Sequence, residues 1–333
     1  MPFIEEIKNR AKQQIKTIIL PEATDIRILK AAQIVNKEKY AKVALIGNKE
    51  EIEKLIKENN LELGDTQIID PAKSDKISEY AKELYELRKA KGMTEEQAQK
   101  LILEPIYYGM MMVKLNHADG LVSGAAHSTA DTLRPALQIL KTAPGTKLVS
   151  AFFVMVVPNC EYGANGTFIF ADSGLNEEPD ADKLSEIAIS SSKSFKQLVG
   201  EEPKVAMLSY STYGSAHSAS TEKVVEATKL AKEKAPELLI DGELQLDAAI
   251  IPEVAEFKAK GSPLKGEANV LVFPDLGAGN IGYKLTQRLA KAEAYGPLCQ
   301  GIARPVNDLS RGCSSEDVAG VVAITAVQAQ SQD

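Results

Sequence analysis

Histidine and cysteine are scarce in this sequence, and tryptophan is absent. With only three histidines, the chain has little material for histidine-based metal centres or Ser-His-Asp triads. Its three cysteines are too few and too scattered for a disulfide framework or a zinc site. We therefore expect no bound metal and a reducing, cytoplasmic compartment. The residues concerned are His117, His127, His217, Cys160, Cys299 and Cys313.

Excess positive charge and long apolar runs are also missing. The net charge of −7 argues against a nucleic-acid partner, which needs a basic footprint. No apolar run approaches the roughly 20 residues that span a bilayer, so we expect no membrane association. The first 16 residues mix acids and bases and lack the apolar core of a signal peptide. Instead, Phe3, Ile7, Ala11 and Ile15 mark one face of a helix.

Arginine is the third scarce residue, because only seven of the 39 basic residues are arginines. In a chain that otherwise uses lysine, the positions of arginine are informative. Arg134, Arg304 and Arg311 lie in or beside turn-rich loops, where a guanidinium group can bind an anion through two parallel hydrogen bonds. Solvated surface arginines remain an equally open interpretation.

The first half of the chain alternates strands with helices, which predicts a mostly parallel sheet covered on both faces. At 333 residues, two domains are expected. The expected strands are Thr17–Leu20, Lys42–Gly47, Thr66–Asp70 and Ala118–Gly124. The expected helices include Asp25–Asn36, Ser74–Ala90, Thr94–Leu103 and Pro105–Leu115, with Met110–Val113 in the core.

A domain crossing is expected at Thr142–Thr146, and the pattern changes after it. The apolar run Leu148–Val157, an Asn-Gly turn and Thr167–Asp172 predict a hairpin. Alternation then resumes. Helices are expected at Asp182–Leu198, Ser220–Lys234, Asp247–Lys258 and Tyr283–Ala294, and strands at Pro203–Tyr210, Leu238–Leu244 and Asn269–Pro274.

The stretch Arg304–Val318 is the densest in chemistry-bearing residues. Asn307 and Asp308 read as turn formers, and Ser314 with Asp317 fits a capping box before an apolar helix. A helix start attracts anions, and Arg311 adds a forked donor. A plain helix cap is the competing interpretation, and spacing alone leaves the chemistry open.

A second loop follows the strand Ala118–Gly124. A strand, a small-residue loop and a helix start together form an arrangement that binds anions. Ser128 and Thr129 offer hydroxyl groups, and Arg134 lies about one turn further on. A capped helix with Arg134 on its exposed side is the alternative. The loop Gly214–Ser218 echoes Gly124–Ser128 weakly.

Gly277–Gly282 matches the G-x-G-x-x-G dinucleotide fingerprint between a strand and a helix. No acidic residue ends a second strand about 20 residues later, as NAD binding requires. We therefore expect no dinucleotide site.

Over essentially its whole length, the sequence resembles the phosphate acetyltransferase (phosphotransacetylase) family. The matching motifs include LPEATDIR, YELRKAKG, DGLVSGAAHSTADTLRPALQI, FPDLGAGNIGYK and NDLSRGCSSED. The resemblance implies an α/β fold with two α/β/α domains, mostly parallel sheets similar to isocitrate and isopropylmalate dehydrogenases, and an active site in the interdomain cleft. It also implies a homodimer. One domain would comprise residues 1–143 plus 296–333, and the inserted second domain residues 144–295.

The activity implied is reversible transfer of an acetyl group between coenzyme A and inorganic phosphate, by direct thiolate attack in a ternary complex. Asp317 would act as base, Ser310 would stabilise the thiolate, and Arg311 would stabilise the oxyanion and the phosphate. Coenzyme A is then a substrate, and no cofactor or metal is needed. The expected substrate-binding residues are Arg88, Arg134, Ser128 and Thr129.

Three alternatives remain open at this point. The enzyme could prefer butyryl phosphate, because the sequence does not reveal the acyl pocket. A dehydrogenase of the same fold would need the NAD fingerprint completed. A non-catalytic acyl-CoA-sensing module would be attached to another domain.

Overall fold

Strand β1 (Thr17–Leu20) lies in the middle of a five-stranded parallel sheet in the computed structural model, which describes residues 2–331. The strand order is β11-β4-β1-β2-β3, and β1 pairs with β2 from Thr17↔Lys42 onward. Every neighbouring pair is parallel. The other strands are β2 (Lys42–Ile46), β3 (Gln67–Ile69), β4 (Gly120–Ser123) and β11 (Val306–Asp308).

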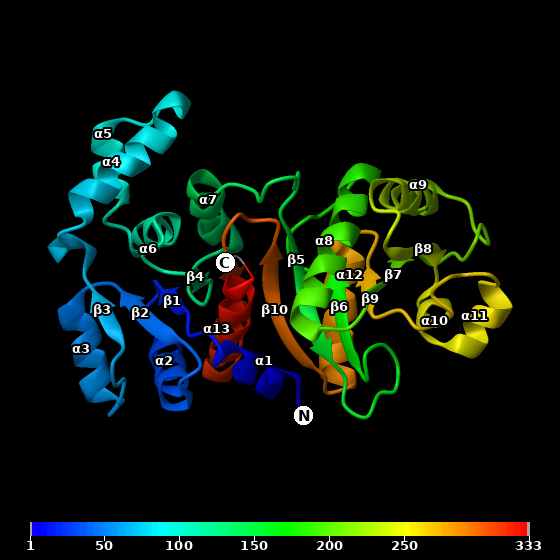
Figure 1. Cartoon of the computed structure of the whole chain (residues 1–333), viewed down its shortest axis with the longest axis horizontal. Coiled ribbons are helices and arrows are strands. Elements are labelled where there is room, and N and C mark those ends of the chain that lie inside the picture. The colour runs from blue at the N-terminus through cyan, green and yellow to red at the C-terminus, as the bar shows by residue number, and fades with distance from the viewer. Residues whose placement is uncertain (1, 332–333) are drawn as a thin grey trace. The chain divides into compact units, whose positions relative to one another are not determined.

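Helices cover both faces of this sheet (Figure 1). Helix α13 packs against α1, α2 and strands β1, β4 and β11, whereas α6 packs against β2, β4 and α7. The helices of this part are α1 (Phe3–Ala11), α2 (Ile26–Glu38), α3 (Lys49–Glu58), α4 (Ile77–Arg88), α5 (Glu95–Leu101), α6 (Pro105–Lys114), α7 (Thr129–Ile139) and α13 (Ser315–Gln330), with short 3-10 turns η1 (Pro71–Lys73) and η2 (Lys89–Lys91).

A second sheet has the order β10-β5-β6-β9-β7-β8. Strand β5 pairs antiparallel with β6 and β10, and the remaining pairs are parallel. The hairpin predicted from the Asn-Gly turn is therefore confirmed. The strands are β5 (Ser150–Val156), β6 (Thr167–Ala171), β7 (Lys204–Leu208), β8 (Leu239–Leu244), β9 (Val270–Val272) and β10 (Glu293–Gln300).

Helices α8 and α9 pack against each other and against the parallel strands, while α12 packs against β5, β6 and β10. The Phe153 ring of β5 stacks on Tyr283 of α12 with ring centroids 4.0 Å apart. The helices are α8 (Ala181–Val199), α9 (Ala219–Lys234), α10 (Leu246–Ile250), α11 (Pro252–Lys258) and α12 (Leu276–Leu289).

The two sheets belong to two compact units. Unit 1 comprises Met1–Pro144 and Ile302–Asp333, and unit 2 comprises Gly145–Gly301. The second crossing lies six residues later than the boundary expected between residues 295 and 296. The reason is that β10 pairs with β5 and so stays in unit 2. Each unit is an α/β structure with mostly parallel strands, as expected.

Several local predictions need correction. The expected helix Asp247–Lys258 is broken into α10 and α11, because Pro252 cannot donate a hydrogen bond to continue the first helix. Asn307 and Asp308 form the edge strand β11 instead of a turn, since pairing with β4 overrides their turn preference. Ile15 lies outside α1 and is 43% exposed, whereas Phe3, Ile7 and Ala11 form the buried face.

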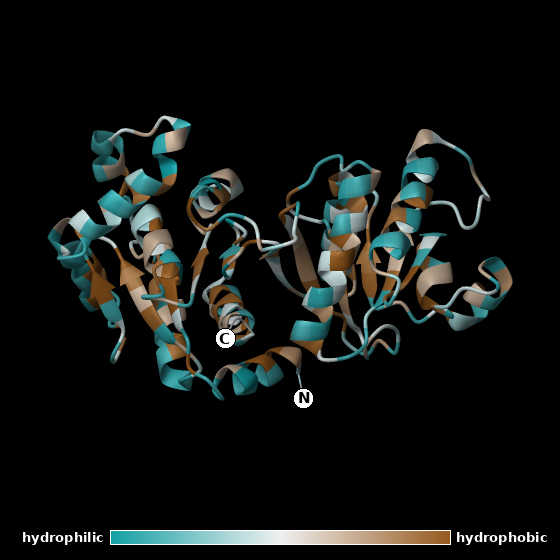
Figure 2. Cartoon of the chain, turned by 45° about the horizontal axis from the view of Figure 1, so that its top comes forward, coloured by the Kyte–Doolittle hydropathy of each residue, from teal (hydrophilic) through white to brown (hydrophobic). Residues whose placement is uncertain are grey.

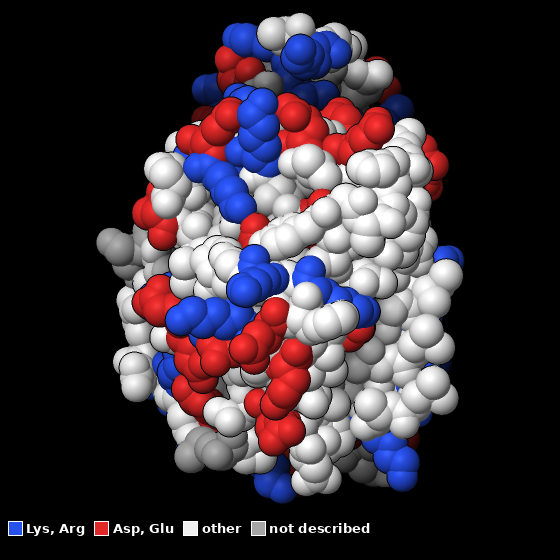
Figure 3. Space-filling model, turned by 90° about the vertical axis from the view of Figure 1, so that its right-hand side faces the viewer, with Lys and Arg blue, Asp and Glu red and all other residues white. Residues whose placement is uncertain are grey.

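Hydropathy and charge follow the layers. Figure 2 shows hydrophobic residues concentrated in the strands, with hydrophilic residues on the outer sides of the helices. On the face shown in Figure 3, basic and acidic side chains are interspersed, unlike the continuous basic footprint that a nucleic acid requires. None of the helices in the described part of the chain combines the length and apolarity that crossing a membrane would need.

Candidate active site

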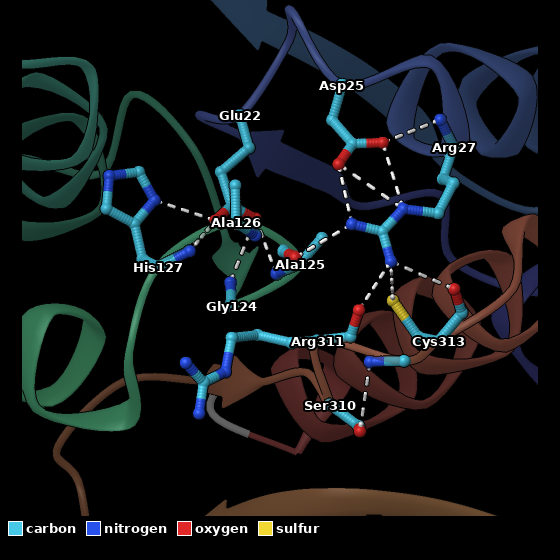
Figure 4. Close-up of polar contacts among 11 residues, drawn as sticks. Glu22, Asp25, Arg27, Gly124, Ala125, Ala126, His127, Ser310, Arg311 and Cys313 are labelled. Carbon is cyan, nitrogen blue, oxygen red and sulfur yellow. Dashed lines mark hydrogen bonds and ion pairs between the residues drawn. The ribbon is translucent and has the colours of Figure 1, made fainter.

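Three loops of unit 1 leave the same edge of the first sheet. Strands β11, β4 and β1 are neighbours and parallel, so the segments after their carboxyl ends lie side by side, where α/β sheets bind ligands. We call these segments the β1 loop (residues 21–25), the β4 loop (residues 124–128) and the β11 loop (residues 309–314). Figure 4 shows them converging.

The β4 loop wraps around the carboxylate of Glu22 from the β1 loop (Figure 4). One Glu22 oxygen accepts from the backbone N–H groups of Gly124 and Ala125, and the other from those of Ala126 and His127, all at 2.9 Å. His127 Nδ1 adds a fifth contact at 2.7 Å. The loop binds an anion, as its composition predicts, but that anion is a side chain of the protein.

Arg27 ties the three loops together. Its guanidinium group pairs with Asp25 at 2.6 Å, which holds the pKa of that carboxyl below its usual value. It also donates to the carbonyl oxygens of Ala125 at 2.8 Å, Arg311 at 2.7 Å and Cys313 at 3.2 Å. One cation therefore fixes the β1, β4 and β11 loops against one another.

The β11 loop presents its functional groups outward. Ser310 and Arg311 are exposed, and the Arg311 guanidinium has no hydrogen-bond or ion-pair partner in residues 2–331. Cys313 is buried, with Sγ 3.8 Å from the Arg27 guanidinium. Burial raises the pKa of the Cys313 thiol to about 11, and the charge of Arg27 only partly opposes this.

Asp317 lies at the start of α13 and completes the predicted capping box, which is confirmed. Its Oδ2 accepts from the Ser314 backbone N–H at 2.9 Å, and its own N–H donates to Ser314 Oγ at 3.1 Å. The side chain is exposed, and within the described chain Oδ1 accepts no hydrogen bond. One oxygen caps the helix, and the other is left without a hydrogen bond among the described residues.

Ser128 and Thr129 use their hydroxyl groups on the protein itself. Ser128 caps α7 and donates to Asp131 at 2.6 Å. Thr129 donates to Asp308 at the end of β11, also at 2.6 Å. Burial raises the pKa of Asp308 to about 6. Substrate binding through these two hydroxyls stays a prediction, and it would require these hydrogen bonds to change.

Arg88 and Arg134 both lie near Tyr107 of α6. Burial raises the pKa of Tyr107, and the nearby charges of Arg134 and Arg88 oppose the shift. Neither guanidinium group has a hydrogen-bond or ion-pair partner among the residues that the structure describes, and Arg88 Nε is buried. By contrast, Arg304 donates to Asn116. Two unpaired arginines from α4 and α7 thus form a candidate anion site.

Sequence reasoning missed Glu22, Arg27, Asp308 and Tyr107. Glu22 and Asp25 follow a strand, at the position where ligand-binding loops begin, and that signal was available in the motif LPEATDIR. Arg27 sits on the first turn of α2, and nothing in its spacing indicates three partners distant in sequence. Asp308 and Tyr107 depend wholly on packing.

The G-x-G-x-x-G match lies inside α12 and not in a strand-to-helix turn. Asp275 caps this helix by accepting from the Ala278 N–H at 2.8 Å, and Gly279 is buried against Asp172. Gly279 and Gly282 therefore serve helix packing, the latter against the ring of Phe273. Within residues 2–331, no three His, Cys, Asp or Glu side chains are grouped so that they could hold a metal ion.

Comparison with known proteins identifies the family of this chain. Residues 2–326 match the protein family described as phosphate acetyl/butaryl transferase. The chain belongs to this family. A phosphate acetyltransferase from Acetivibrio thermocellus is 68% identical over 330 residues, covering 99% of each chain.

Solved structures of phosphotransacetylases share the fold over the full chain. The EutD phosphotransacetylase from Staphylococcus aureus is 47% identical with a TM-score of 0.89, covering 98% of this chain and 99% of that one. A phosphotransacetylase from Streptococcus pyogenes is 42% identical with a TM-score of 0.92, covering 99% and 98%. A protein from Salmonella typhimurium, described as a 4-hydroxythreonine-4-phosphate dehydrogenase, resembles this chain in fold alone. It is 12% identical, with a TM-score of 0.50.

Proposed function

We propose that this chain catalyses acetyl-CoA + phosphate = acetyl phosphate + CoA. The observation that carries the proposal is the segment formed by the β11 loop and the first turn of α13. Ser310, Arg311 and Asp317 are exposed together on a segment fixed by Arg27, at the sheet edge where ligands bind. Membership of the phosphate acetyl/butaryl transferase family and the names of close relatives support the same reaction.

The chemistry needs a thiolate, an electrophilic carbonyl and a stabilised leaving group. In the direction of acetyl-CoA formation, the CoA sulfur attacks the carbonyl carbon of acetyl phosphate. A C–S bond forms, the C–O bond to phosphate breaks, and phosphate leaves with the electron pair. The thiol proton passes to the free Oδ1 of Asp317, while Ser310 donates a hydrogen bond to the sulfur. The unpaired Arg311 offsets the charge that develops on the carbonyl and the departing phosphate.

Transfer is direct in this proposal, with both substrates bound. The alternative to attack by the CoA sulfur is attack by Cys313 of the β11 loop. The Cys313 thiol is buried, however, and its pKa is raised to about 11. Such a thiol is almost entirely protonated at neutral pH and is a poor acyl acceptor. Arg88 and Arg134 supply cations for the phosphate groups of CoA, since neither has a partner within the described residues.

We further propose a cytoplasmic homodimer. The three cysteines are free thiols, which suits a reducing compartment. The dimer rests on the family resemblance, and light scattering during gel filtration should give twice the chain mass.

The deciding experiment measures thiol release from acetyl-CoA in the presence of phosphate, together with formation of acetyl phosphate. A parallel assay with butyryl-CoA separates the two acyl groups that the family description covers. Acetyl transfer that exceeds butyryl transfer supports the proposal, and Cys313→Ala should retain that activity. Phosphate-dependent thiol release from neither substrate would contradict it.

A further inference from the structure

The β4 loop has the backbone of an anion site, yet the protein fills it with its own carboxylate. Glu22 occupies four consecutive backbone N–H groups, and its side chain is only 1% exposed. Breaking this arrangement would leave a buried charge without its donors, which is costly. A substrate phosphate therefore cannot use these N–H groups and must be bound by side chains around the loop.

His127 is the side chain that this arrangement orients. Its Nδ1 lies 2.7 Å from Glu22, and an ionised carboxylate can only accept, so Nδ1 carries the hydrogen. The second ring nitrogen, Nε2, points away from Glu22 (Figure 4). The His127 side chain is 44% exposed, whereas Glu22 is buried. A buried carboxylate thus holds one ring nitrogen and leaves the other available to a ligand.

The surroundings of His127 suit a phosphate group. The Ser128 hydroxyl lowers the pKa of Asp131, and the charges of Arg134 and His127 lower it further. Arg134 and His127 therefore both lie near the Asp131 carboxylate. Arg134 has no hydrogen-bond or ion-pair partner in the part of the chain that the structure describes. At the same sheet edge, the neighbouring β11 loop exposes the unpaired Arg311. An oriented imidazole and two free guanidinium groups are donors that a phosphate can use.

We propose that His127, held in place by Glu22, binds a phosphate group of a substrate through Nε2. The proposal rests on the acyl-transfer function above and adds a binding residue to it. The phosphate could belong to acetyl phosphate or to coenzyme A, and both present the same oxygen acceptors. Glu22 acts as a positioning residue, because it touches His127 and the β4 loop and not the substrate.

Two substitutions separate substrate binding from a structural role. The amide nitrogen of asparagine lies near the position of a histidine Nδ1, and that of glutamine near Nε2. His127→Asn keeps the contact with Glu22 and loses the outer donor. We expect it to melt like the wild type while the Michaelis constant for one substrate rises about tenfold to a hundredfold, the effect of losing one charge-assisted hydrogen bond. His127→Gln should recover part of that constant and lose some stability.

The kinetic arms identify the source of the phosphate. If His127→Asn raises the Michaelis constant for acetyl phosphate, His127 binds the phosphoryl group of that substrate. If it raises the Michaelis constant for CoA, and the difference from the wild type disappears with dephospho-CoA, His127 binds the 3′-phosphate. His117→Asn is the matched control. His117 is also exposed with Nδ1 bonded, at 2.6 Å to Tyr80, but it lies before the opposite end of β4. It should leave all constants unchanged.

Wild-type Michaelis constants for both substrates in an active His127→Asn enzyme would overturn the inference and leave Glu22 and His127 as loop scaffolding. An inactive wild-type enzyme would instead count against the proposed function. Glu22→Gln is expected to destabilise the β4 loop, so the pair of His127 variants carries the test.

Discussion

At the residue scale, Asp317 combines a cap with a free carboxylate oxygen. Oδ2 accepts from the Ser314 N–H, and the other oxygen of this exposed side chain accepts no hydrogen bond within residues 2–331. The two interpretations left open by the sequence are therefore compatible. The cap is a structural fact, and the base is part of the proposed function.

Asp317→Asn should separate these two roles. Asparagine keeps an oxygen to accept from Ser314 but cannot take a proton from the thiol. We expect near-wild-type melting and a turnover number lower by about 10² to 10⁴, with Michaelis constants little changed. Thermal denaturation and steady-state kinetics measure the two effects.

Ser314→Ala is the matched control, because it removes the other half of the capping box. It should cost about 1 kcal/mol of stability and leave turnover within a few-fold. A destabilised Asp317→Asn enzyme with wild-type turnover would reduce Asp317 to a cap.

The buried carboxyl group of Asp308 contributes a stability that falls as the pH rises. Its pKa is raised from 3.8 to about 6 in the folded protein, chiefly by burial. A raised pKa favours the protonated folded form, so this stabilisation is complete below about pH 4 and is lost as the pH passes 6. Asparagine at position 308 does not titrate. From about pH 5 to pH 7.5, the unfolding free energy of Asp308→Asn should therefore rise relative to that of the wild type by on the order of 1 kcal/mol. Urea denaturation at both pH values measures the difference.

Asp131→Asn is the control, because its stability relative to the wild type should not change between about pH 5 and pH 7.5. The pKa of Asp131 is lowered, first by the Ser128 hydroxyl, so its contribution is present above about pH 4 and is lost as the pH falls. The stability of Asp308→Asn relative to the wild type should not stay constant with pH. If it does, Asp308 has an ordinary pKa in the folded protein.

At the element scale, internal carboxylates hold the loops that leave the strands. Glu22 binds the β4 loop, and in unit 2 Asp172 accepts from the N–H groups of Gly174 and Leu175 at 2.9 Å. Glu243 accepts from Gly214 N–H at 2.7 Å in the loop that echoes the β4 loop. Small-residue loops here expose many N–H groups, and a buried carboxylate satisfies several of them at once.

Gly279 tests how closely α12 approaches the strand end. A Cβ at Gly279 would lie 2.5 Å from the backbone oxygen of Asp172, so helix and backbone would have to move apart. Overpacking of this kind costs about 1–3 kcal/mol, which exceeds the roughly 1 kcal/mol that alanine gains in helix propensity. Gly279→Ala should therefore be destabilising in urea denaturation.

Gly277→Ala is the control on the same helix. Gly277 is exposed, and its nearest atom is Asp275 Oδ1 at 3.2 Å. The unfolding free energy of Gly277→Ala should stay within about 1 kcal/mol of the wild-type value. Equal stabilisation by both alanines would show that α12 does not pack closely at Gly279.

At the scale of the whole molecule, unit 1 is discontinuous in sequence. Strand β11 and helix α13 return after unit 2, and α13 is buried from Val318 to Ala329. The β11 loop, with Ser310 and Arg311, belongs to this returning segment. The candidate site therefore exists only when both ends of the chain have folded together.

A chain that ends at Gly301 should retain unit 2 and lose unit 1. Removing α13 exposes the apolar residues of β1 and β4 against which it packs. Hydrogen exchange followed by mass spectrometry should show β1, β2 and β4 unprotected while β5 to β9 keep their protection. Unchanged protection in β1 and β4 would show that unit 1 folds without its C-terminal segment.

The sequence by itself determined the alternation of elements and the places where loops carry chemistry. Periodic apolar residues indicated the strands and helices of both units, and Ser314 with Asp317 indicated the start of α13, because these signals act over a few residues. The resemblance to phosphate acetyltransferases selected Arg88, Arg134, Ser310, Arg311 and Asp317 as the candidate site.

Only the tertiary structure decided what occupies the loops. The β4 loop read as a site for an external anion, but Glu22 fills it, and Arg27 joins three segments from both ends of the chain. Asn307 and Asp308 became a strand because β4 offered an edge to pair with. Hydrogen bonds between residues about 100 and 280 positions apart leave no periodic trace in a sequence, because they arise only when the sheet brings its carboxyl ends together.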